Sequence, residues 1–214
     1  MDWSEIKIQT AIIAGSVTAI GWLVTHVLAV WREDLKHSRE AYLLHTEKQL
    51  EELYGPLAFQ VYEGRRTFKD LLSTLGRSAV FLSSGESLSE DDLKTWQFWA
   101  ENDFRPRNKT IKQLLLNKPH LIEGNSMPKS YVEFLDHCNS WEINHLRWEL
   151  EGVEYSWHSN INWPDKFEED VINVFSQLQK RRASLIIGMS TARVSLPWVI
   201  VIMLIGGAIW YFAR

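Results

Sequence analysis

Two histidines have the spacing that comes closest to a chemical site. His137 and His145 lie about two helical turns apart, so both fall on one face of a predicted helix. Cys138, Glu142 and Glu149 lie nearby in the sequence. Zinc usually takes three or four ligands, and side chains two turns apart do not reach one ion without a ligand from elsewhere. We therefore interpret the pair as part of a solvated or hydrogen-bonded polar face and expect no metal.

No motif in the sequence would bring catalytic groups together. The chain has no Walker phosphate loop, dinucleotide-binding glycine motif, nucleophile elbow or kinase signature. Its single cysteine, Cys138, excludes an intrachain disulfide and agrees with a reducing compartment, so we expect a small buried residue there. We predict that the protein is not an enzyme, with no catalytic residue and no cofactor.

A run of basic residues lies between Asp103 and Glu123, with no acid among them. Because the chain as a whole has a net charge of -4, the run forms a local positive patch. Such a patch could bind nucleic acid, an acidic partner or anionic lipid headgroups. It could equally be an ordinary solvated helix face, balanced by the acids of residues 86–92. The candidate partner-binding residues are Arg105, Arg107, Lys109, Lys112 and Lys118.

Two uncharged stretches, residues 8–31 and 194–213, are each long enough to cross a bilayer. About 20 apolar residues in a helix span the hydrocarbon core, whereas buried core helices are usually shorter. Aromatic residues lie near the ends of both stretches, where interfacial belts occur. A cleaved signal peptide would need a basic start in place of Asp2 and Glu5. We predict a transmembrane helix at each end.

Basic residues beside the two spans predict the orientation of the chain, because Lys and Arg are retained on the cytoplasmic side. Three follow the first span and four precede the second: Arg32, Lys36, Arg39, Lys180, Arg181, Arg182 and Arg193. We therefore expect residues 32–193 to form a cytoplasmic domain. Residues 1–7 and the C-terminus would lie outside.

The first span contains small and ionisable residues that a simple membrane anchor does not require. Ala11, Gly15 and Ala19 recur every four residues, a spacing that lets helices approach closely in lipid, either the second span or another protomer. His26 lies near the predicted cytoplasmic edge, where it could face headgroups. An ionisable residue in a span could also line a pore. We take these four residues as candidates for transmembrane packing and gating.

The middle of the chain is predicted to be an all-α bundle, because apolar residues recur at helical spacing and no strand pattern competes. We expect the prolines at 56 and 106 to end or kink helices. The expected helices cover residues 33–54, 57–75, about 89–105, 107–117, about 126–151 and a last one from Pro164. Core positions expected in the long fifth helix are Tyr131, Leu135, Cys138, Trp141, Leu146 and Trp148.

One passage of the chain resembles known membrane proteins. It comprises Glu47-Lys48-Gln49-Leu50-Glu51-Glu52-Leu53-Tyr54-Gly55-Pro56-Leu57, followed by Arg65-Arg66-Thr67-Phe68. This passage looks like one found in small bacterial membrane proteins just after an N-terminal span. With the two-span layout, it resembles the two-transmembrane effectors of retron-type anti-phage defence systems. We expect Tyr54 to Leu57 to form a corner that folds the second helix back on the first.

The resemblance implies a toxin in the bacterial inner membrane that a partner holds inactive. The partner would be a protein or ribonucleoprotein, such as a reverse transcriptase with its RNA-DNA product. Release would allow the spans to associate, as a homo-oligomer in the lipid bilayer, and to permeabilise the membrane. A non-toxic membrane-anchored scaffold or signalling adaptor fits the same features.

Overall fold

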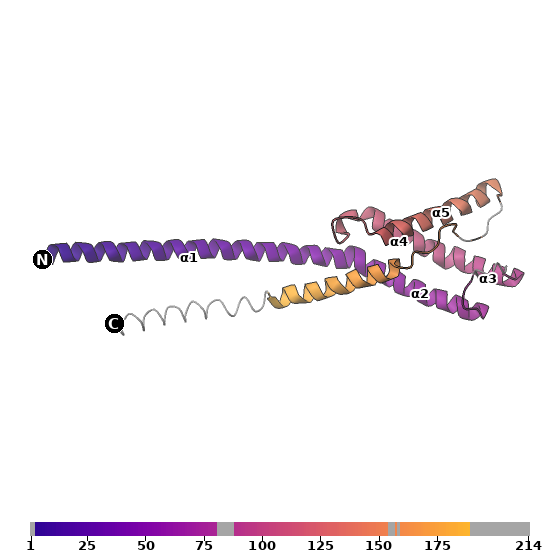
Figure 1. Ribbon diagram of the computed structural model, residues 1–214, viewed down its shortest axis with the longest axis horizontal. Helices are drawn as coiled ribbons and strands as arrows, with labels where there is room; N and C mark the ends of the chain where they lie inside the picture. Colours follow the sequence, from indigo (N-terminus) through magenta and orange to yellow (C-terminus); the bar gives the residue numbers. More distant parts are fainter. Residues whose placement is uncertain (1–2, 81–87, 154–156, 158, 189–214) are drawn as a thin grey trace. The chain divides into compact units, whose positions relative to one another are not determined.

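A computed structural model describes residues 3–80, 88–153, 157 and 159–188, without the side chains of residues 3–14 and Val17. Most of the described residues are helical and none lies in a strand, so the predicted all-α class is confirmed (Figure 1). Within the part of the chain whose side chains are described, no helix combines the length and apolar character that a bilayer crossing requires. The predicted span at 194–213 lies outside the described residues. The span at 8–31 lies within them, but the side chains of residues 8–14 and Val17 are not described.

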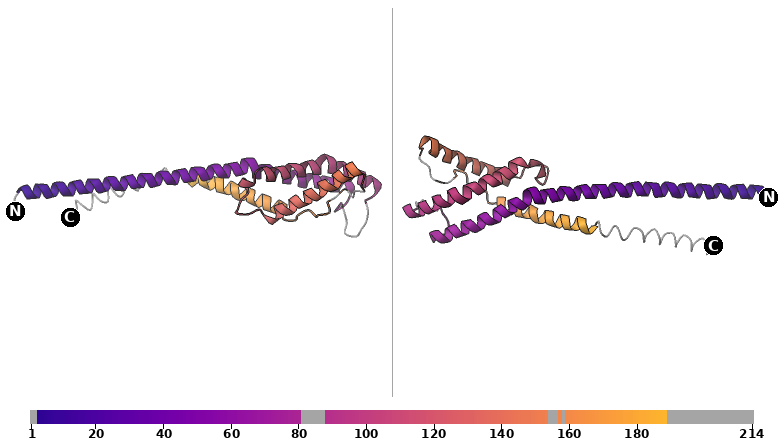
Figure 2. Two further views of the ribbon diagram at one scale, coloured as in Figure 1. Left: turned by 90° about the horizontal axis from the view of Figure 1, so that it is seen from above. Right: turned by 180° about the vertical axis from the view of Figure 1, so that it is seen from behind.

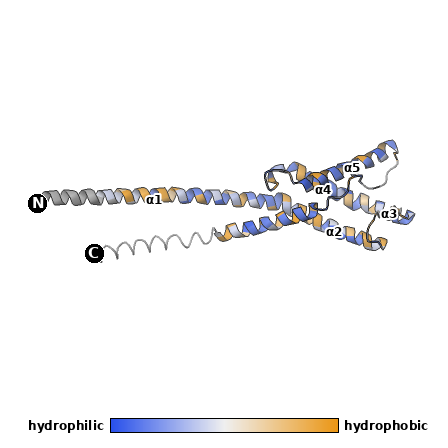
Figure 3. Cartoon of the chain, viewed as in Figure 1, coloured by the Kyte–Doolittle hydropathy of each residue, from blue (hydrophilic) through white to orange (hydrophobic). Residues whose placement is uncertain are grey.

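The chain divides into two compact units, Thr46–Ala183 and Met1–His45 with Ser184–Arg214. We describe each unit by itself. The first helix, α1, covers Trp3–Lys48, and Figure 2 shows it as one unbroken ribbon. Figure 3 shows an apolar stretch of α1 followed by a more polar one. The described side chains of residues 18–31 are all exposed.

The passage around Pro56 is a π-helical turn. The turn covers Gln49–Tyr54, and α2 follows directly as Gly55–Leu75 with proline in its first turn. Lys48, Tyr54 and Gly55 keep right-handed helical dihedral angles, and the Gly55 amide bonds to the Leu50 carbonyl five residues back. Because the wider turn lets the chain pass the proline ring, the helical path is not broken. The prediction that Tyr54 to Leu57 breaks the helix at a corner was therefore wrong.

The same arrangement recurs before Pro106. Helix α3, Glu90–Trp99, leads into the π-helical turn Ala100–Phe104, and α4 continues as Arg105–Asn117. Here the Arg105 amide bonds to the Ala100 carbonyl, again five residues back. The expected interruption at Pro106 is thus a second π-helical turn within one helical path.

Most other helix boundaries agree with the predictions. Ser89 caps α3, since its hydroxyl accepts a hydrogen bond from the Asp92 amide at 3.1 Å. Helix α5 covers Lys129–Glu151, and Gly76 and Gly152 end α2 and α5 with left-handed φ angles of 63° and 65°. A 3₁₀ turn, Pro119–Leu121, follows α4. The last helix covers residues 167–188 of the described chain.

The Thr46–Ala183 unit has two apolar cores. One lies between α2, α4, α5 and the last helix, with Tyr54, Leu57, Ile111, Phe134 and Phe167 among its members. The other gathers large aromatic residues from α3, the turn after it and α5. Its buried members are Leu71, Val80, Trp96, Ala100, Phe104, Trp141 and Trp157. Both cores lie within this unit and hold its helices together.

Two of the core positions predicted for α5 are wrong. Leu146 and Trp148 are 44% and 38% exposed, whereas Tyr131, Cys138 and Trp141 are buried. The buried face of α5 instead includes Phe134, His137 and His145. One ring nitrogen of each histidine has a hydrogen-bond partner, Ile161 for His137 and Arg105 for His145, which a hydrophobic pattern does not reveal.

Candidate binding site between the helices

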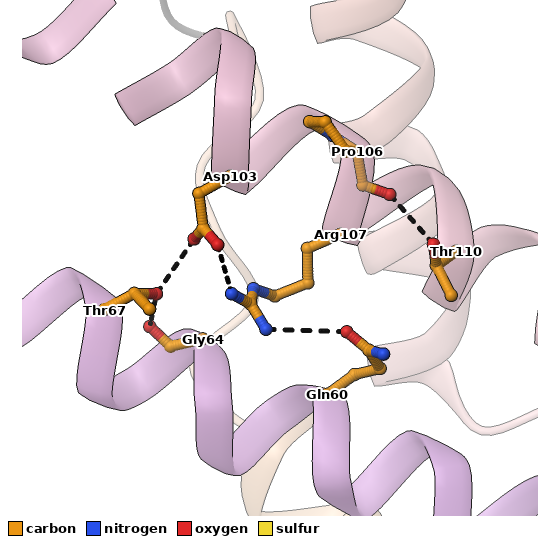
Figure 4. A network of polar contacts seen from close by, with 7 residues as sticks. All are labelled: Gln60, Gly64, Thr67, Asp103, Pro106, Arg107 and Thr110. Atoms are coloured by element: carbon orange, nitrogen blue, oxygen red, sulfur yellow. Dashed lines mark hydrogen bonds and ion pairs between the residues drawn. The ribbon is translucent and has the colours of Figure 1, made fainter. Parts of the chain in front are cut away.

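The polar centre of the Thr46–Ala183 unit is an ion pair between Arg107 and Asp103 (Figure 4). Both side chains are largely buried, with 12% and 25% of their surface exposed. The Thr67 hydroxyl donates to the second Asp103 oxygen at 2.9 Å, and Arg107 Nη1 lies 3.5 Å from Gln60 Oε1. Gly64 makes room for this arginine, because a Cβ there would lie 3.1 Å from Arg107 Cδ. The pair thus connects α4 to α2 across the interior.

Three other residues of the predicted basic patch also have partners within the chain. Lys112 pairs with Glu142 at 2.8 Å, and Lys118 pairs with Glu52 at 3.1 Å. Arg105 donates a hydrogen bond to His145 Nε2 at 2.8 Å, since arginine has no acceptor. Lys109 is exposed and makes no direct ion pair with the described residues. Ion pairs therefore compensate Arg107, Lys112 and Lys118, whereas Arg105 and Lys109 have no ion pair among the described residues.

The acids that balance the basic residues are not those expected. The acids of residues 86–92 were expected to balance the basic patch. In the structure Asp92 pairs with Arg77 instead, and Glu90 lies 3.2 Å from Lys94. The partners come from other elements, with Asp103 before α4 and Glu142 on α5. Asp103 lies only four residues before Arg107, whereas helix packing brings Glu142 to Lys112 and Glu52 to Lys118.

A cleft of about 350 Å³ lies between α4 and α5. Arg105, Lys109 and Lys112 line it together with two carboxylates, Glu101 and Glu142. Its remaining lining residues are Pro106, Asn108, Cys138 and Trp141. With three cations against two carboxylates, the cleft favours an acidic group. Lys112 donates a hydrogen bond to Glu142 and thereby lowers the pKa of that carboxyl, so Glu142 stays charged.

Three titratable groups of α5, His137, His145 and Cys138, have pKa values shifted in favour of their uncharged forms. His137 Nδ1 donates to the Ile161 carbonyl at 2.6 Å, and burial lowers the pKa of His137. Burial, followed by the Arg105 charge, lowers the pKa of His145. Burial raises the pKa of the Cys138 thiol to about 12, so it remains protonated. Among the described residues, no group of three or more ligand side chains could hold a metal ion.

The candidate packing residues of the first span lie on a helix without covering contacts. Ala11 falls outside the described side chains, and Ala19 is exposed. A Cβ added at Gly15 would meet no atom within 4 Å. His26 stacks on Trp22 with ring centroids 5.5 Å apart. Gly15, Ala19 and His26 are thus accessible to another helix.

Sequence reasoning missed the Arg107 and Asp103 pair and its contacts with α2. A signal was present, since an acid four residues before an arginine is a favourable helical spacing. Gly64 gave a second signal, because glycine inside a predicted helix often marks a close approach. Neither signal identifies the partner helix, which the tertiary packing decides.

No known family model matches the chain, and neither a curated protein nor a solved structure is significantly similar to it. The resemblance of residues 47–68 to membrane effectors therefore stays a prediction.

Proposed function

We propose that the chain is an effector of the bacterial inner membrane that a partner holds inactive and that permeabilises the membrane on release. In this proposal residues 8–31 and 194–213 cross the bilayer, and the helical domain binds the partner in the cytoplasm. The observation that carries the proposal is the two-sided distribution of exposed side chains on α1.

One side of α1 suits lipid tails. At 3.6 residues per turn, all the large apolar residues of this stretch except Trp22 fall on one side of the helix. They are 48% to 63% exposed: Ile20, Leu23, Val24, Val27, Leu28, Val30 and Trp31. In water such a continuous exposed apolar face is costly, whereas in hydrocarbon it is favourable.

The other side suits another helix. Gly15, Ala19 and His26 fall there, and small residues allow backbones to come close in lipid. Thr25 lies on the same side, and its hydroxyl donates to the carbonyls of Gly21 and Trp22, both at 2.8 Å. Because this hydroxyl bonds within its own helix, it could enter hydrocarbon without losing a hydrogen bond. We infer that this side mediates association of released chains.

The test is to induce the chain alone in bacteria and to follow the membrane potential with a voltage-sensitive dye. We expect depolarisation and arrested growth. Gly15→Leu should weaken both, because leucine would keep the packing sides apart. Gly21→Leu is the matched control, since Gly21 is also uncovered but lies off the line of Ala11, Gly15 and Ala19. An unaltered potential at high expression would remove the effector function.

The partner surface that we propose is the cleft between α4 and α5, with Lys109 as its accessible cation. Lys109→Glu should reduce partner capture in co-purification while leaving the fold intact, because Lys109 is exposed and makes no direct ion pair with described residues. Lys94→Glu is the control, because Lys94 of α3 is also exposed but does not line this cleft. Arg107 is unsuitable for this test, since changing it would break a buried ion pair.

The alternative function is a membrane-anchored scaffold. One observation favours it, namely that the Thr46–Ala183 unit contains both cores and could present its surface without any change in α1. A scaffold would leave the membrane potential unchanged when expressed alone and would still capture its partner. Depolarisation by the chain alone would exclude this alternative.

A further inference from the structure

The second half of α5 carries three large apolar side chains that remain well exposed. Ile143, Leu146 and Leu150 are 55%, 44% and 74% exposed. Their spacing of three and four residues places them in one stripe along the helix, which we call the α5 stripe. Cys138 and Trp141, which belong to the two cores, lie on a different side of α5. The α5 stripe therefore lies away from the core that α5 helps to form.

The spacing of the α5 stripe is that of a seam between two helices. Ile143, Leu146 and Leu150 take the a, d and a positions of a heptad, at which paired helices meet. A β-branched residue at a and leucine at d, here Ile143 and Leu146, favour two parallel helices. Exposure of these side chains to water is unfavourable, and packing against a second apolar stripe removes it. The pattern thus indicates a helix as the occupant.

The charges beside the α5 stripe indicate that this helix is α5 of a second copy. One edge of the stripe carries Glu142 and Glu149, and the other edge carries Arg147. In a parallel pair the acidic edge of each copy faces the basic edge of the other, so Glu142 lies opposite Arg147 of the second copy. In an antiparallel pair each edge would face itself, with like charges opposed. The charges therefore favour parallel packing.

Both charged groups have atoms available for this contact. Lys112 donates to Glu142 Oε2, and no described residue bonds to Glu142 Oε1. Arg147 donates to Glu151 through Nε, and its two terminal nitrogens have no acceptor among the described residues. The pair between Arg147 and Glu151 is exposed at both side chains, so it stabilises the helix little and competes weakly with a new contact.

We propose that α5 is a dimerisation surface, on which the α5 stripe packs in parallel against the same stripe of a second copy. The seam covers about two helical turns, whereas a coiled coil recognisable by itself has about three to four heptads. Two dissolved chains would therefore associate weakly through it, and confinement of both copies to one membrane supplies the local concentration that the contact needs. The inference rests on the membrane insertion proposed above and does not depend on toxicity.

The test is disulfide crosslinking of the full chain in bacterial inner membranes. Single cysteines are introduced as Ile143→Cys, Leu150→Cys and Glu151→Cys. The membranes are washed with alkaline carbonate, returned to neutral pH and treated with copper phenanthroline as a mild oxidant. A disulfide forms only when the two Cα atoms lie about 4.4–6.8 Å apart. The unaltered chain is the blank, because its single cysteine, Cys138, is buried.

We expect covalent dimers from both Ile143→Cys and Leu150→Cys, because in a parallel pair each position meets itself. Glu151→Cys should give about fivefold less dimer, since Glu151 is exposed but lies about 100° around the helix from Leu150. An antiparallel pair cannot join both positions to themselves, because they lie about 10 Å apart along the helix. Dimers from only one of the two variants, or only from a mixture of them, would overturn the proposal.

A charge reversal tests the contact between the edges. Arg147→Glu, added to Leu150→Cys, should lower the yield of dimer about threefold, because both edges of the stripe are then acidic. Lys129→Glu in the same background is the matched control. Like Arg147, Lys129 pairs with a glutamate four residues on, but it lies far from the stripe. Equal yields from the two double variants would overturn the proposal.

The washed membranes separate two kinds of failure. A chain that stays in the membranes but gives no dimer at residues 143 and 150, or as much dimer at residue 151, would overturn this inference alone. A chain that the wash releases would overturn the membrane insertion of the proposed function, and this inference with it.

Discussion

At the scale of single residues, the Arg107 and Asp103 pair is the main polar contribution to the packing of α2 against α4. We predict that Asp103→Asn destabilises the Thr46–Ala183 unit by about 3 kcal/mol, because it leaves a buried arginine without its counter-ion. The measurement is urea unfolding of a fragment covering residues 46–183, followed by circular dichroism.

An exposed pair provides the control for that variant. Lys94 lies 3.2 Å from Glu90, and both side chains are well exposed. Lys94→Gln should therefore change the free energy of unfolding by less than about 0.5 kcal/mol. Equal effects of Asp103→Asn and Lys94→Gln would mean that the buried pair stabilises the unit no more than the exposed pair does.

The buried histidines make stability depend on pH. Because burial lowers the pKa of His137 in the folded state, the unfolded chain takes up its proton first as the pH falls. We predict that stability is full above the ordinary histidine pKa and declines as the pH falls from there to the folded pKa. Each unit of difference between the two pKa values corresponds to about 1.4 kcal/mol.

The check is the urea midpoint of the same fragment as a function of pH. His137→Asn keeps a donor for the Ile161 carbonyl and removes the proton uptake, so its decline should be shallower. A remaining decline is expected from His145, whose pKa is lowered as well. Identical pH profiles for the fragment and His137→Asn would contradict this explanation.

The partners and the burial of single side chains were the features least predictable from the sequence. The helix expected over residues 107–117 is confirmed by α4, but the partners of Lys112 and Lys118 were not identified, because packing brings Glu142 and Glu52 near. The spacing placed Cys138 and Trp141 in the core. Leu146 and Trp148 have the same apolar character but stay partly exposed, which periodicity does not reveal.

At the scale of elements, the two π-helical turns are the distinctive feature. Each lies just before a proline and replaces the break that sequence rules predict. Caps were predictable because Ser89, Gly76 and Gly152 act through local geometry. Whether a proline breaks a helical path or is accommodated within it depends on the neighbouring packing, so the corner expected at Tyr54 to Leu57 was wrong.

The first π-helical turn requires glycine. A Cβ at Gly55 would lie 2.5 Å from the Leu50 carbonyl oxygen, which is backbone and has little freedom to move. We predict that Gly55→Ala destabilises the domain by about 2 kcal/mol or more, within the range for strained backbone sites. The measurement is the urea midpoint of the domain.

Gly64→Ala is the informative comparison. Its added methyl group would meet only the flexible side chain of Arg107, at 3.1 Å, so the cost should be smaller than at Gly55. A Gly55→Ala variant as stable as Gly64→Ala would show that the turn relaxes readily.

At the scale of the whole molecule, the Thr46–Ala183 unit should fold without the rest of the chain. Both apolar cores lie within it, so removing the other residues takes away none of their buried members. We predict that a fragment of residues 46–183 is soluble, helical and unfolds cooperatively. Circular dichroism and size-exclusion chromatography are the measurements, and a fragment that aggregates or unfolds without a transition would contradict this prediction.

The central claim of the account is that the ends of the chain reside in lipid. The most direct measurement is the distribution of the full-length chain between membrane pellet and supernatant after an alkaline carbonate wash of bacterial membranes. We predict that the chain stays in the pellet and is released only by detergent, whereas residues 46–183 alone appear in the supernatant. Recovery of the full-length chain in the detergent-free supernatant would contradict the membrane insertion on which both proposed functions depend.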